Sequence, residues 1–199
     1  MILKDFLKKV FNITNVYENE SNSYFCPNLW EDYYCQIELI PDENKNQVVK
    51  IFNQIENLIS KNENENGFTE IYERDKSEFS TLRKQININD FENIFQNSKL
   101  LKAHKIKYEN FRMINCEDEK TKAFGISDFV IFYDIKESIV NNIWIDYQNF
   151  DSDNFRNLEE NILEILSEIG TKYNLILVDW NKLEIVDLKN KIEIKKYCR

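Results

Sequence analysis

The most regular hydrophobic pattern of the chain lies near its C-terminus, between residues 155 and 188. Apolar residues first recur there at helical spacing and form one stripe, which consists of Leu158, Ile162, Ile165, Leu166 and Ile169. Asp151 and Asp153 can cap the start of this helix, and Gly170 stands where a C-cap glycine would. The pattern therefore predicts a helix that ends near Gly170.

Two apolar segments follow, at residues 175–180 and 183–188, with Asn181 and Lys182 between them. They predict a β-hairpin with a tight turn, in which Val178 lies opposite Ile185. Both faces of the hairpin are largely apolar, so we expect it to lie in a sheet that is covered on both sides. Asp179 would lie opposite Glu184, an unfavourable pair of like charges, which we expect to be hydrated unless it meets a cation or a basic side chain of a partner.

Alternation and helical spacing also assign the rest of the chain. Strands are expected at residues 33–40, 68–73, 79–86, 105–114, 129–135 and 143–147, and helices at 2–11, 48–59 and 91–95, the last capped by Asn89 or Asp90. Residues 190–198 could form a strand or a short helix, and the helix is favoured. In the first of these strands Tyr34, Gln36 and Glu38 should point to solvent, and residues 136–142 should form a loop. Strands outnumber helices and short loops join many neighbours. These features predict a single α+β domain over residues 1–199, with a mainly antiparallel sheet and flanking helices.

Charge and cysteine content narrow the classes of partner and compartment. The net charge of −9 would repel nucleic acids and anionic membranes and would favour a cationic protein partner. The four cysteines have no metal-site spacing, as is typical of reduced thiols, and the N-terminus lacks the apolar core of a signal peptide. No apolar run approaches the roughly 18 residues of a membrane span. We therefore expect a cytoplasmic protein.

Candidate catalytic chemistry is sparse. The only histidine, His104, is surrounded by lysines and has no nearby acid to orient it, so we expect no catalytic residue there. Three glycines do not provide a phosphate-binding loop, and no spacing indicates a metal site or a cofactor. A nuclease-like group of Asp187, Glu193 and Lys195 remains as an alternative, with carboxylates that would hold a metal.

Acidic residues beside aromatic rings are better candidates, because such combinations form good anchors at protein interfaces. They occur at residues 30–34, around Trp144 and in the C-terminal hairpin. The candidate binding residues are Trp30, Glu31, Asp32, Tyr34, Trp144, Asp146, Asp179 and Glu184.

The C-terminal hairpin reads Leu-Ile-Leu-Val-Asp-Trp-Asn followed by Glu-Ile-Val-Asp-Leu. With the acidic composition, it resembles the closing hairpin of bacterial immunity proteins, which neutralise cognate polymorphic or contact-dependent toxins. This resemblance covers only the last third of the chain. It implies that the protein occludes the active site of a cationic toxin, usually a nuclease. A phage-encoded inhibitor of a host defence enzyme and a metal-dependent nuclease or other enzyme remain the alternatives.

Overall fold

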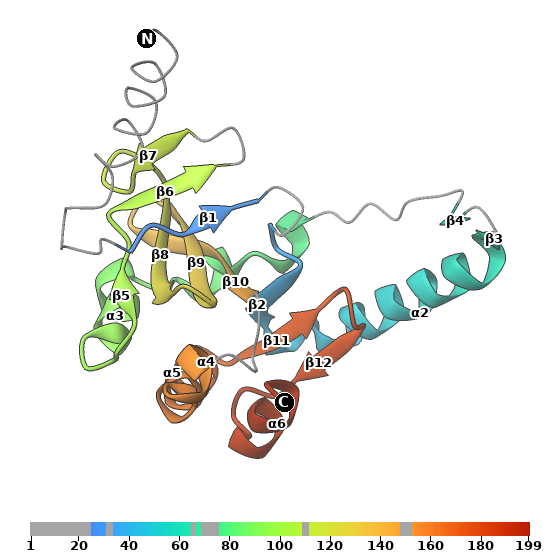
Figure 1. Ribbon diagram of the computed structural model, residues 1–199. Coiled ribbons are helices and arrows are strands. Elements are labelled where there is room, and N and C mark those ends of the chain that lie inside the picture. Colours follow the sequence, from blue (N-terminus) through green and yellow to red (C-terminus); the bar gives the residue numbers. More distant parts are fainter. Residues whose placement is uncertain (1–24, 31–33, 65–66, 69–75, 109–111, 148–152) are drawn as a thin grey trace, which may run out of the picture.

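A computed structural model describes residues 25–30, 34–64, 67–68, 76–108, 112–147 and 153–199 (Figure 1). The predicted helix at residues 2–11 and most of the predicted strand at 68–73 lie outside the described residues. The candidate binding residues Glu31 and Asp32 also lie outside them.

A seven-stranded sheet forms the centre of the fold, in the order β12-β11-β2-β10-β9-β8-β5 (Figure 1). Every neighbouring pair in it is antiparallel. Its strands are β2 Ile37–Pro41, β5 Leu101–Lys102, β8 Thr121–Ile126, β9 Phe129–Lys136, β10 Ile139–Tyr147, β11 Leu175–Asp179 and β12 Glu184–Val186. The predicted α+β class with a mainly antiparallel sheet is confirmed.

Helices cover one face of this sheet. Among the described residues these helices are α3 Ile88–Glu92, α4 Asp153–Arg156, α5 Glu159–Tyr173 and α6 Lys191–Tyr197, while α2 Lys45–Asn62 lies on the opposite face. Short 3-10 turns are η3 Asp42–Asn44, η4 Lys76–Phe79, η5 Thr81–Lys84 and η6 Asn93–Phe95. The apolar stripe of α5, with Phe91 of α3 and Ile194 of α6, packs on Leu177 and Ile145 of the sheet in the largest buried cluster. The predicted helix at 48–59 is confirmed within α2. The helix predicted at 91–95 is confirmed as the end of α3 together with η6, and the helix at 190–198 is confirmed as α6.

Two smaller cores cover the opposite face. Over β8, β9 and β10 lies a small sheet of β1 Asn28–Leu29, β6 Lys105–Tyr108 and β7 Met113–Asn115, which encloses Phe132 and Trp144. The predicted strand at 105–114 is therefore two strands. Over β2 and β11 lies α2, whose Val48 and Phe52 pack on Val178 and Trp180. A further pair, β3 Glu63–Asn64 and β4 Gly67–Phe68, follows α2.

The C-terminal hairpin has the predicted register. Val178 pairs with Ile185 and Asp179 with Glu184, and β11 is buried on both faces as expected. The pairing ends at Asp179–Glu184, so the turn is longer than two residues, and Leu183 adopts a left-handed backbone with φ 51°. β12 is an edge strand and remains half-exposed.

Truncation of a side chain should therefore lower stability by different amounts on the two strands of this hairpin. Val178 has no exposed surface, so Val178→Ala is expected to lower the free energy of unfolding by about 2 kcal/mol through lost burial and a cavity. Ile185→Ala on the half-exposed strand should cost less. Urea denaturation checks both values, and equal effects would contradict the asymmetry.

Residues 79–86 are not a strand, although their pattern predicted one. They form parts of η4 and η5 because Ser80 and Thr81 make side-chain bonds that compete with a ladder. The Ser80 hydroxyl accepts a hydrogen bond from Leu82 N and donates to Asn141, which lies at a bulge in β10, and the Thr81 hydroxyl donates to Val140 O.

Three other details differ from the predictions. The expected loop at 136–142 is a two-residue turn, since Glu137 and Ser138 both have positive φ, as a tight hairpin turn requires. Asn87 caps α3, not Asn89 or Asp90. Gly170 lies inside α5, and the left-handed residue that ends this helix is Asn174.

Candidate functional site

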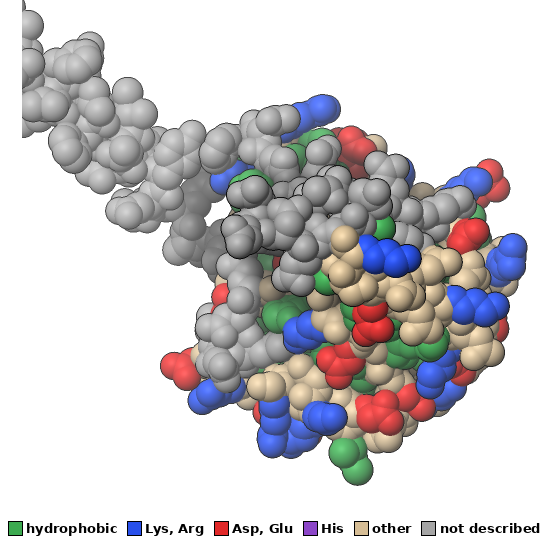
Figure 2. All heavy atoms as spheres, turned by 90° about the vertical axis from the view of Figure 1, so that its right-hand side faces the viewer, with side chains coloured by type: hydrophobic (Ala, Val, Ile, Leu, Met, Phe, Trp, Pro, Cys, Tyr) green, Lys and Arg blue, Asp and Glu red, His purple; other side chains and the backbone are tan. Residues whose placement is uncertain are grey.

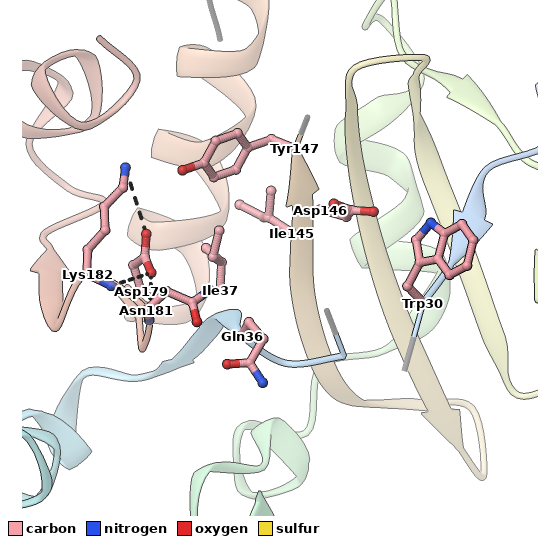
Figure 3. A pocket seen from close by; sticks show the side chains of 9 residues that line it. All are labelled: Trp30, Gln36, Ile37, Ile145, Asp146, Tyr147, Asp179, Asn181 and Lys182. Carbon is pink, nitrogen blue, oxygen red and sulfur yellow. Dashed lines mark hydrogen bonds and ion pairs between the residues drawn. The ribbon is translucent and has the colours of Figure 1, made fainter. Parts of the chain in front are cut away.

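A pocket opens at the end of the central sheet, between β10 and the β11–β12 turn. It exists because β2, which separates these strands, begins only at Ile37, after a turn in which Cys35 has a φ of 55°. β10 continues past that point to Tyr147. We call this cavity of about 500 Å³ the edge pocket (Figure 3). It is lined by Trp30, Gln36, Ile37, Ile145, Asp146, Tyr147, Asp179, Asn181 and Lys182.

One half of the edge pocket holds an internal cation, Lys182. Its Nζ lies 4.6 Å from the ring centre of Tyr197, 5.6 Å from that of Tyr147 and 3.9 Å from Asp179 Oδ2. Burial lowers the pKa of Lys182, but a hydrogen bond with Tyr147 and the nearby carboxylates outweigh it, so the pKa is raised. A carboxylate and two aromatic rings therefore stabilise this ammonium group.

Asp179 is a buried residue of the pocket wall. Its side chain is only 1% exposed, so the expectation that it is hydrated is wrong. It accepts hydrogen bonds from the Tyr197 hydroxyl at 2.8 Å and from the backbone N–H groups of Asn181 and Lys182 at 3.0 Å each. These bonds fix the β11–β12 turn, and Glu184 lies half-buried across the ladder.

Tyr197→Phe should show how much this support contributes. Burial and the charge of Asp179 raise the pKa of Tyr197, so its hydroxyl remains a donor. Because the bond goes to a charged group, its loss is expected to lower the free energy of unfolding by about 1.5 kcal/mol, as measured by urea titration. An unchanged midpoint would mean that water replaces the hydroxyl at no cost.

The other half of the edge pocket contains Asp146 and Trp30, on the opposite side of β10 from Tyr147 (Figure 3). Burial raises the pKa of Asp146. Among the described residues no lysine or arginine forms an ion pair with it. Trp30 is 38% exposed, a large apolar surface for such a ring. Asp146 also lines a second cavity of about 390 Å³, the neighbouring pocket, with Phe25, Cys26 and Asp128.

The structure thus brings together three of the predicted binding residues, Trp30, Asp146 and Asp179. Tyr34 and Trp144 lie elsewhere: their rings meet at 4.7 Å, and the Tyr34 hydroxyl donates to the buried Asp134 at 3.0 Å. Trp144 has no exposed surface, so it is a core residue. Its indole N–H has no hydrogen-bond partner in the described part of the chain.

No protein family, curated protein or solved structure matches this chain. The site is therefore interpreted from its own residues. Sequence reasoning missed the role of Lys182, which it treated only as a turn residue, and that of Tyr197. The only sequence signal for either residue was that Lys182 lies in the turn directly after the predicted strand whose end contains Asp179.

The group proposed for a nuclease has other contacts. Glu193 is part of the N-terminal cap of α6, where its carboxylate accepts from Asn190 Nδ2 and from Asp187 N, both at 3.1 Å. Lys195 donates to Glu160 at 3.4 Å. In the described ranges no three His, Cys, Asp or Glu side chains gather as metal ligands, and no described helix is long and apolar enough to cross a membrane.

Proposed function

We propose that this chain is an immunity-type protein that binds a basic toxin inside the cell and occludes the toxin's active site. The observation that carries the proposal is the Asp146 half of the edge pocket. A carboxylate that forms no ion pair within the described part of the chain lies there, and the exposed ring of Trp30 lines the same half. Tryptophan is enriched among the residues that dominate binding energy, and a carboxylate complements a basic surface.

The net charge of −9 supports the same class of partner, since it attracts a cationic protein over long range. It does not locate the contact. On the face shown in Figure 2, acidic and basic side chains of the described residues are interspersed and do not form one acidic patch. The specific contact is therefore assigned to the pocket, whereas the overall charge increases the rate of encounter.

The proposed mechanism is steric. A nuclease holds phosphates with lysine and arginine side chains, and these same groups are attracted to carboxylates. An acidic protein seated over that site would prevent the substrate from reaching it. The protein needs no chemistry of its own for this function, and rigid positioning of the β11–β12 turn by Asp179 keeps one wall of the pocket fixed.

Expression of the neighbouring genes in a heterologous bacterial host tests this proposal. We expect one neighbour to encode a basic protein that stops growth when expressed alone, and co-expression of this chain to restore growth. The two purified proteins should form a complex whose association slows with added salt. An inhibitor encoded by a phage would bind a host enzyme instead, so the absence of any toxic neighbour product would contradict the immunity function.

A further inference from the structure

Each half of the edge pocket contains a carboxylate and aromatic rings, but only one half also contains a cation from the described residues. In one half, the ammonium group of Lys182 is held by Asp179 and by the rings of Tyr147 and Tyr197. In the other half, Asp146 and Trp30 again combine a carboxylate with an aromatic ring. The described residues supply no cation to this second half.

A partly buried carboxylate without an ionic partner is unfavourable, because burial removes hydration that nothing replaces. A carboxylate beside another pocket of this protein, in contrast, has partners within the chain. Near α3, Glu92 accepts from the Tyr133 hydroxyl at 2.6 Å and forms an ion pair with Lys102 at 2.5 Å. The fold therefore pairs an acid inside one pocket with its own groups and leaves Asp146 open to two pockets.

We propose that the edge pocket receives an arginine side chain of the partner, with the guanidinium against Trp30 and its N–H groups on Asp146. The origin of this arginine in a basic toxin rests on the proposed function. Arginine fits better than lysine because its planar, weakly hydrated group both stacks on an indole and donates two parallel bonds to one carboxylate. A cavity of about 500 Å³ accommodates the whole side chain.

The direct test uses a small probe, so that it does not depend on finding the toxin. Nα-acetyl-arginine amide is titrated into the ¹⁵N-labelled full chain while the three tryptophan indole N–H signals are followed by NMR. Trp30 is exposed, whereas Trp144 and Trp180 are buried, so the probe should shift one indole signal in a saturable way. The matched neutral probe is Nα-acetyl-citrulline amide, which keeps the shape and loses the charge.

Two variants complete the design. Asp146→Asn is expected to weaken the binding of the arginine probe at least tenfold. Glu56→Gln removes the same charge from an exposed position of α2 and should leave the affinity unchanged. Trp30→Ala removes the stacking surface at an exposed site and should also weaken binding, as followed by the backbone amides of Asn181 and Lys182.

Equal binding of the arginine and citrulline probes, or an affinity that Asp146→Asn does not change, would overturn the inference. Tighter binding of Nα-acetyl-lysine amide than of the arginine probe would overturn the assignment to arginine. These outcomes are separate from those of the growth assay. If the chain rescues growth but does not bind the arginine probe, the arginine assignment fails while the immunity function stands.

Discussion

Gly170→Ala is expected to lower the free energy of unfolding by about 3 kcal/mol. Gly170 is buried in α5, where the helix lies against the segment that follows β12. A Cβ atom at this position would lie 2.2 Å from Leu188 Cβ and 2.9 Å from the carbonyl carbon of Leu188. Leu188 is fully buried and backbone atoms are involved, so the contact is relieved only if the helix and this segment separate.

The sign of this effect distinguishes packing from helix propensity. In an ordinary helix interior, alanine in place of glycine stabilises by about 0.5–1 kcal/mol. The overlap with Leu188 should exceed that gain. Thr171→Ala is the matched control, because Thr171 is the next residue of α5 and is exposed. Urea denaturation should give a large loss for Gly170→Ala and little change for the control. Equal stability of the glycine variant and the native chain would contradict the close approach.

Gly170 also shows what the sequence could and could not predict about the fold. The register of β11 with β12 followed from alternation and a short connection, both of which are local. A glycine after the last apolar residue of a helix has two possible roles, which the sequence does not separate. It can end the helix, or it can let another segment approach closely. Here the second role applies, and Asn174 ends the helix with a φ of 54°.

Buried acids were the second kind of error. Alternation placed Glu38 in solvent, yet it is 4% exposed and accepts a hydrogen bond from Trp180 Nε1 at 2.8 Å. Asp134 is likewise buried and bound by Tyr34 and Thr121. Each carboxylate is stabilised by a donor that is distant in the sequence or on another strand, and no local pattern identifies such a partner.

The candidate site likewise depends on contacts between segments that are distant in the sequence. Acid beside aromatic residues singled out Trp30, Asp146 and Asp179 as residue types suited to an interface. Their meeting in one pocket depends on the strand order, in which β2 lies between β10 and β11 and begins late. That arrangement joins segments more than 100 residues apart. Sequence reasoning therefore identified these members of the site without predicting their convergence.

Asp146→Asn is expected to improve stability and to impair binding at the same time. Burial raises the pKa of this carboxyl in the folded chain above the value of about 3.9 in an unfolded chain. Folding therefore disfavours the ionised form. The resulting penalty is present at neutral pH and disappears as the pH falls below the unfolded pKa, where the group is protonated in both states. Asparagine never carries this penalty, so the variant should melt at a higher temperature at pH 7, and the difference should shrink toward pH 4.

The same substitution should weaken binding of the basic partner about 100-fold, because it leaves the partner's charged group in the pocket without a carboxylate. Calorimetry with the purified complex measures this loss, and thermal melting of the free chain measures the gain. Glu56→Gln should change neither quantity appreciably. A variant at Asp146 that lost stability and affinity together would indicate a structural residue. A rise in stability together with a loss of affinity is expected if the Asp146 carboxylate binds an external cation and does not stabilise the fold.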